Sequence, residues 1–154
     1  MRDAALKEPR EGAKDPTAKA LADEAFTVLE TQMSTSGWDD IYDIAYGTSG
    51  TQYPAAAGRA RKILNRGERS KMNPALQVTL ELQGAGASCA AKSFFDRAQA
   101  VGDERTLFQL KQLSTMHQMK QQGFKKIDLL GCLHDGQLAR TIAALEERLR
   151  LKKK

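Results

Sequence analysis

The sequence predicts an all-α fold in which about seven helices stack as antiparallel hairpins. Two observations favour it. Apolar residues recur at helical spacing along most of the chain, whereas strict alternation is nearly absent. In addition, segments 53–67 and 88–102 both open with small residues, continue with bulkier ones and end on glycine. Their offset of 35 residues is typical of helical repeats, which bind other molecules on their outer surfaces.

Three helices are predicted in the first half of the chain, after a charged segment, 1–14, that lacks apolar periodicity and is expected to form a flexible arm. Asp15 followed by Pro16 is a typical helix start, and so is Pro54 at a first helical position. Segments rich in serine, threonine and glycine end the first two helices, and Gly67 ends the third. The expected helices cover about 16–33, 38–46 and 54–66.

Four helices are predicted in the second half. Asn73-Pro74 repeats the cap-plus-proline signature; the partly alternating stretch that follows is also compatible with a strand, but its neighbours favour a helix. Gly102 followed by Asp103 marks one helix end and the next helix start. Residues 122–134 are expected to be irregular. The expected helices cover about 74–83, 88–101, 104–121 and 136–151, followed by a basic tail, 152–154.

Composition is that of a single globular domain, which we expect over 15–151. The chain has 154 residues, of which 41% are hydrophobic and 28% charged. No segment approaches the roughly 20 apolar residues that a membrane span needs, and no apolar stretch near Met1 marks export. Two cysteines, Cys89 and Cys132, allow at most one disulfide, so a reduced, cytoplasmic setting is expected.

Charge is distributed unevenly. Residues 1–50 contain 5 basic and 10 acidic residues, whereas residues 51–154 contain 19 basic and 9 acidic ones. Helical geometry places Arg59, Lys62 and Arg66 on one face. The basic stripe, which we predict to be an interaction surface, consists of Arg59, Lys62, Arg66, Arg69 and Lys71. Two interpretations stay open: the stripe binds phosphate, as in nucleic-acid binding, or it packs against the acidic first half.

No catalytic, cofactor-binding or metal site is expected. Cys89, Cys132, His117 and His134 are metal-ligating residue types, but their spacing does not bring them together, and a buried cysteine more often packs as a small apolar residue. An enzyme using Cys132 with either histidine is the least favoured hypothesis, because nucleophile–base pairs are recognised by geometry rather than spacing.

Several short motifs resemble one family. The most specific is Gly102-Asp103-Glu104-Arg105-Thr106-Leu107. Shorter ones are Tyr53-Pro54, Arg59-Ala60-Arg61, Pro74-Ala75-Leu76, Cys89, Arg97-Ala98, Gly131-Cys132-Leu133-His134 and Thr141-Ile142-Ala143-Ala144. With these, residues 38–148 resemble the C-terminal helical region of large bacterial serine/threonine protein kinases of the myxobacterial type. That family often carries further cysteines where this chain has Gly123-Phe124-Lys125-Lys126, which argues against a cysteine-rich metal site.

The resemblance implies a helical-repeat region that accompanies a kinase and binds partners or regulates it. The chain has no glycine-rich phosphate loop, V-A-I-K lysine, H-R-D or D-F-G motif of a kinase. We therefore expect a HEAT-like α-solenoid that acts as a non-catalytic protein-interaction or regulatory module, without a cofactor. The alternative is a helical-repeat nucleic-acid-binding protein that uses the basic residues of 59–71.

Overall fold

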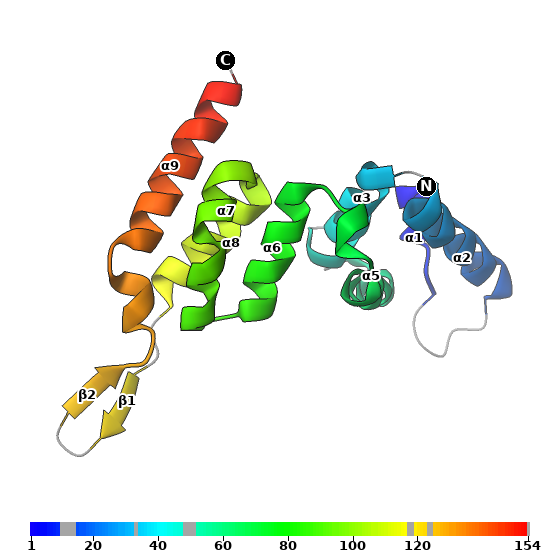
Figure 1. Cartoon of the computed structure of the whole chain (residues 1–154). Helices are drawn as coiled ribbons and strands as arrows, with labels where there is room; N and C mark the ends of the chain where they lie inside the picture. Colours follow the sequence, from blue (N-terminus) through cyan, green and yellow to red (C-terminus); the bar gives the residue numbers. More distant parts are fainter. Residues whose placement is uncertain (10–14, 33, 48–51, 117–118, 123–124, 154) are drawn as a thin grey trace. The chain divides into compact units, whose positions relative to one another are not determined.

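The structure, a computed structural model, describes residues 1–9, 15–32, 34–47, 52–116, 119–122 and 125–153, with 119–122 and 125–128 described by their backbone. Within these residues the chain forms eight α-helices, three short 3-10 helices and one two-stranded hairpin (Figure 1). The predicted α-helical class is confirmed. The helices group into two compact units, 1–73 and 74–154, although the sequence showed no boundary near residue 73. One repeat domain over 15–151 stays a prediction.

The first unit is built from helices that pack in chain order, α1 on α2, α2 on α3 and α3 on α5. Asp15 accepts a hydrogen bond from the amide of Ala18 (2.9 Å) and Pro16 follows it, so α2 begins as predicted. The core of the first unit holds Phe26, Leu29, Trp38, Ile41, Tyr42, Ile44, Ile63 and Leu64, with alanines between them. The elements are α1 (Arg2–Ala5), α2 (Pro16–Thr31), α3 (Ser34–Tyr46), α5 (Pro54–Arg66) and the 3-10 helix η1 (Arg69–Lys71).

Two expectations for the first unit need correction. Part of the arm expected over 1–14 is folded, because residues 2–5 form α1 and Ala5 is fully buried. The break expected before Trp38 is wrong, because α3 already begins at Ser34 and Gly37 is buried within it. Ser34, the first residue of α3, has a φ of 52° and so lies in the left-handed region. The expected end near Met33 and the loop 48–50 lie outside the described residues.

The second unit is a bundle in which α6 contacts α7 and α8, and both of these contact α9. Its core includes Val78, Leu82, Phe95, Ala98, Leu110, Leu113, Leu130, Leu133, Leu138 and Leu145. The elements are α6 (Pro74–Ala85), the 3-10 helix η2 (Cys89–Phe94), α7 (Phe95–Val101), α8 (Glu104–Thr115), β1 (Met119–Gln122), β2 (Lys125–Asp128), the 3-10 helix η3 (Gly131–His134) and α9 (Gln137–Lys152).

The helix end predicted at Gly102 and the helix start predicted at Asp103 are confirmed. The Asp103 carboxylate accepts hydrogen bonds from the amides of Arg105 (3.0 Å) and Thr106 (3.2 Å), while the Thr106 hydroxyl accepts one from the Asp103 amide (3.1 Å). Burial raises the pKa of Asp103, but Arg105 and these amides lower it more, so the pKa lies below its ordinary value. The Thr106 and Thr79 hydroxyls, 2.7 Å apart and fully buried, join α8 to α6.

The predicted helix 104–121 is too long. α8 ends at Thr115, where the hydroxyls of Ser114 and Thr115 bond to backbone carbonyls one turn back (2.7 and 2.9 Å), and Met116 is extended. Such side-chain bonds offer the backbone an alternative to the helix. The antiparallel pair β1–β2 follows, with Lys120 opposite Ile127, where a helix end and an irregular segment were expected.

Smaller differences concern the remaining helices. The helix predicted over 88–101 is a 3-10 turn up to Phe94 and an α-helix only after it. At the C-terminus, α9 continues through Lys152, so the predicted basic tail is partly helical, and Lys153 forms an ion pair with Glu104 (2.7 Å). In the part of the chain that the structure describes, no helix is both long enough and apolar enough to cross a bilayer.

Candidate interaction surfaces

The first predicted surface residue, Arg59, lies in a network of opposite charges within the first unit. Its guanidinium is 2.8 Å from a carboxylate oxygen of Glu8 and 2.5 Å from one of Asp23, and it lies over the ring of Phe26 at 4.6 Å. Its hydrogen bond, followed by that of Lys19, lowers the pKa of Asp23. Burial lowers the pKa of Arg59 itself, but its two acidic partners outweigh burial and raise it. Arg59 is thus a structural cation.

The other members of the basic stripe are also mostly engaged within this unit. Arg66 pairs with Glu30 on α2 (3.1 Å) and Lys71 with Glu68 (3.3 Å). The Arg69 guanidinium lies 3.8 Å from the sulfur of Met72. Lys62 forms no ion pair with any residue that the structure describes; it lines a cleft of about 500 Å³ beside Arg59. Arg59 and Arg66 therefore both reach acidic side chains of α2, and an interaction role for the stripe stays a prediction.

A substitution at Arg59 tests whether this residue stabilises the first unit. We expect Arg59→Ala to lower the free energy of unfolding by about 2 kcal/mol, because Glu8 loses its half-buried cation and Phe26 its cation–π contact. Lys62→Ala, one turn further along α5, is the matched control and should change it by less than about 0.5 kcal/mol. Urea unfolding followed by circular dichroism gives both values. Equal losses for the two variants would contradict the structural role of Arg59.

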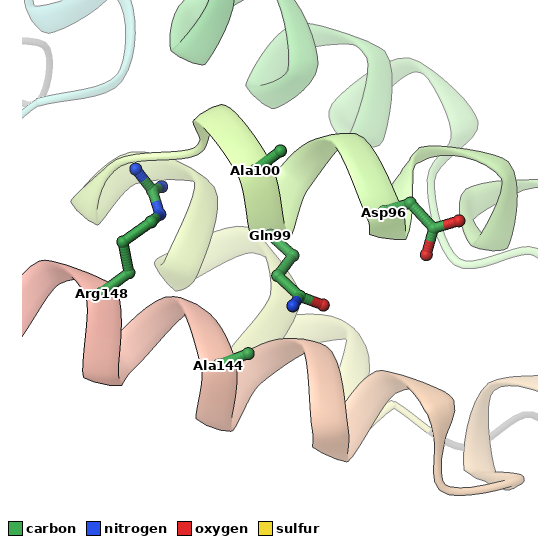
Figure 2. A pocket seen from close by; sticks show the side chains of 5 residues that line it. All are labelled: Asp96, Gln99, Ala100, Ala144 and Arg148. Carbon is green, nitrogen blue, oxygen red and sulfur yellow. The ribbon is translucent and has the colours of Figure 1, made fainter.

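A polar cleft of about 550 Å³ lies between two helices of the second unit (Figure 2). Figure 2 shows its lining residues, Asp96, Gln99 and Ala100 on α7 and Ala144 and Arg148 on α9. A terminal nitrogen of Arg148 donates to the carbonyl of Gly102, which ties α9 to the end of α7. The cleft therefore contains a structural junction and carries charges of both signs.

A second depression in this unit, which we call the apolar groove, has a volume of about 460 Å³ and a mostly apolar lining. It is lined by Ser114, Leu133, His134, Gly136, Leu138, Ala139, Ile142, Ala143 and Glu146. At its rim Glu146 forms an ion pair with Lys111 of α8 (2.5 Å). Ala139 and Ala143, one turn apart on α9, are exposed, so this part of the lining is open to a binding partner.

The two cysteines form a disulfide, which replaces the reduced pair expected from the sequence. Cys89 begins η2 and Cys132 lies in η3; they are 43 residues apart in sequence and their Cα atoms are 5.8 Å apart. Lys92 of η2 forms an ion pair with Asp135 just after η3, so a second contact joins the same two segments. The hydrogen bond from Lys92, followed by one from the Gln137 amide, lowers the pKa of Asp135.

The structure also places the histidine and cysteine candidates. His134 is exposed at the apolar groove, and both sulfurs belong to the disulfide, so neither is a thiolate in this state. His117 lies outside the described residues. Among the residues that are described, no three His, Cys, Asp or Glu side chains lie close enough together to hold a metal ion.

Comparisons of the chain with protein-family models, with curated proteins and with solved structures found no match. The functional interpretation therefore depends on the surfaces themselves. The sequence predicted the basic stripe as an interaction surface but not the apolar groove, although Ala139 and Ala143 beside Ile142 widen the apolar face of α9 beyond its leucines. The cysteine spacing contained no signal for the disulfide, because the pairing spans 43 residues of intervening chain.

Proposed function

We propose that the chain is a non-catalytic helical module that binds a protein partner, and that the apolar groove is the contact site. The observation that carries this proposal is an open apolar depression on α9 with a charged rim formed by Lys111 and Glu146. An apolar centre with a polar rim is the usual arrangement of a protein-binding surface. A groove of this size accommodates a few apolar side chains from one face of a partner helix.

The charges of the first unit favour this proposal over nucleic-acid binding by the basic stripe. Residues 1–73 contain 11 basic and 11 acidic residues, and three of the stripe residues pair with acids of that unit. Phosphate binding depends on cations that are free to replace counterions. The net charge of +5 belongs entirely to residues 74–154, which contain 13 basic and 8 acidic residues.

The finer expectations from the sequence form part of the proposal. They are a HEAT-like stacking of the helices, an association with a bacterial serine/threonine kinase, and a cytoplasmic location. The equivalent glycine ends of α5 and α7 support the repeat: both Gly67 and Gly102 are extended, and a Cβ on either would lie within 2.6 Å of a neighbouring atom. The preceding helices differ, since α5 has 13 residues and α7 has 7.

Ala143→Glu tests the proposed contact site. Because Ala143 is exposed on α9, the added carboxylate should leave the fold intact but place a bulky, charged side chain in the apolar groove. We expect the amount of partner captured from nuclease-treated source-cell extract to fall by about tenfold or more, equivalent to about 1.4 kcal/mol. Ala100→Glu, at a position in the polar cleft that is also exposed, is the control and should capture as much as the unmodified chain.

Equal capture by both variants would exclude the apolar groove as the contact site. Capture that disappears after nuclease treatment, or that weakens steeply with salt whichever alanine is changed, would instead support nucleic-acid binding.

A further inference from the structure

The disulfide of the second unit is accessible from one side. Cys89 is exposed, whereas Cys132 is half-buried and packs against the core of the unit. Thiol–disulfide exchange requires the attacking thiolate to reach one of the two sulfurs, and accessibility decides which. Exposed disulfides are the labile ones, whereas structural disulfides resist reduction. The geometry therefore favours attack at Cys89, with Cys132 as the leaving group.

The disulfide is attached to a wall of the apolar groove. Cys132 lies in η3 between Gly131 and Leu133, and the next two residues after it, Leu133 and His134, line the groove. Glycines lie on both sides of this wall: the space that a Cβ on Gly131 would occupy is open, and Gly136 has a φ of 87°. Such residues absorb changes in backbone dihedral angles at low cost. The cross-link thus holds a segment whose flanking glycines can change their backbone dihedral angles at low cost.

We propose that Cys89–Cys132 is a thiol-exchange site whose reduction releases η3 and reshapes the apolar groove. A thiolate of a dithiol reductant attacks the sulfur of Cys89; the disulfide bond breaks, and Cys132 leaves as a thiolate that takes up a proton. The second thiol of the reductant then displaces Cys89 from the mixed disulfide. The reductant is oxidised by two electrons to its own disulfide, and the chain gains two thiols.

Two contacts keep the change local. Leu133 is 1% exposed and belongs to the core, and the Lys92–Asp135 ion pair also joins η2 to the segment after η3. Both contacts persist when the disulfide opens, so the helices stay folded while the backbone of η3 gains freedom. This inference rests on the proposed function only in identifying the groove as the ligand-binding surface; the exchange chemistry itself involves no partner.

The test uses the full chain without denaturant. Dithiothreitol should reduce the disulfide while the helical circular dichroism signal is retained. Amide hydrogen exchange over 131–135 should then accelerate by about tenfold or more, with exchange in α2, α3 and α5 unchanged. Reduction that occurs only together with loss of the helical signal, unchanged exchange over 131–135, or an acceleration that is equal throughout 74–154 would overturn the proposal.

A second measurement identifies the attacked sulfur. Limiting glutathione, a monothiol, should form a mixed disulfide mainly at Cys89, as mapped by peptide mass spectrometry after acid quenching. An adduct mainly at Cys132 contradicts the proposed direction of attack. These measurements contain no partner, so their failure is distinguishable from failure of the Ala143→Glu capture experiment.

Discussion

The double variant Cys89→Ser/Cys132→Ser is expected to lower the free energy of unfolding of residues 74–154 by about 4 kcal/mol. The disulfide spans 43 residues, and cross-linking a loop of this length removes conformational entropy from the unfolded chain by about this amount. Serine is close to cysteine in size, so the folded state loses little besides the cross-link. Urea unfolding of the oxidised unmodified chain and of the double variant measures the difference.

The reduced unmodified chain is the control for this experiment. Its free energy of unfolding should match that of the double variant, because both lack the cross-link. The two chains differ only in having cysteine sulfurs or serine oxygens at positions 89 and 132. A difference below about 1 kcal/mol between the oxidised chain and the double variant would mean that the disulfide does not constrain the unfolded state. The reduced unit should nevertheless stay folded, since single domains have total stabilities of about 5–15 kcal/mol and neither cysteine is among the buried core residues around Phe95, although Cys132 packs against them.

The sequence predicted features that depend on neighbouring residues. Asp15-Pro16, Asn73-Pro74 and Gly102-Asp103 each mark the start of a helix as expected, because caps and prolines act through the backbone within one turn. The errors occurred where local signals were weak or misleading. The serines and threonine at 34–36 resemble a helix-breaking segment but form the first turn of α3, a position that suits these residue types. The polar segment 117–128 has neither helical nor strand-like apolar periodicity.

Features that depend on distant residues were not predictable. Helical spacing placed Arg59 and Arg66 on one face correctly, but only the packed structure shows Asp23 and Glu30 of α2 opposite them. The second interpretation of the basic stripe, packing against the acidic first half, is the one that these contacts favour. The disulfide and the apolar groove depend on η3 lying beside η2 and α9, contacts between segments separated by tens of residues. No spacing rule for two cysteines specifies such a contact.

The division into two units makes a prediction about cooperativity. Phe26 in the first unit and Phe95 in the second are both fully buried, and replacing either by alanine leaves a cavity that costs about 3–5 kcal/mol. If each unit has its own core, Phe95→Ala should accelerate amide exchange in α6, α7, α8 and α9 while α2, α3 and α5 keep their protection. Phe26→Ala should show the opposite pattern.

Each of these two variants is the control for the other, because the chemical change is the same and only the unit differs. Residue-resolved hydrogen exchange of the full chain in native conditions provides the measurement. If either substitution accelerates exchange equally in both units, the chain unfolds as one cooperative domain, as the sequence suggested for 15–151. Selective effects would instead mean that a partner bound at the apolar groove stabilises residues 74–154 alone, because a ligand raises the stability only of the cooperative unit that forms its site.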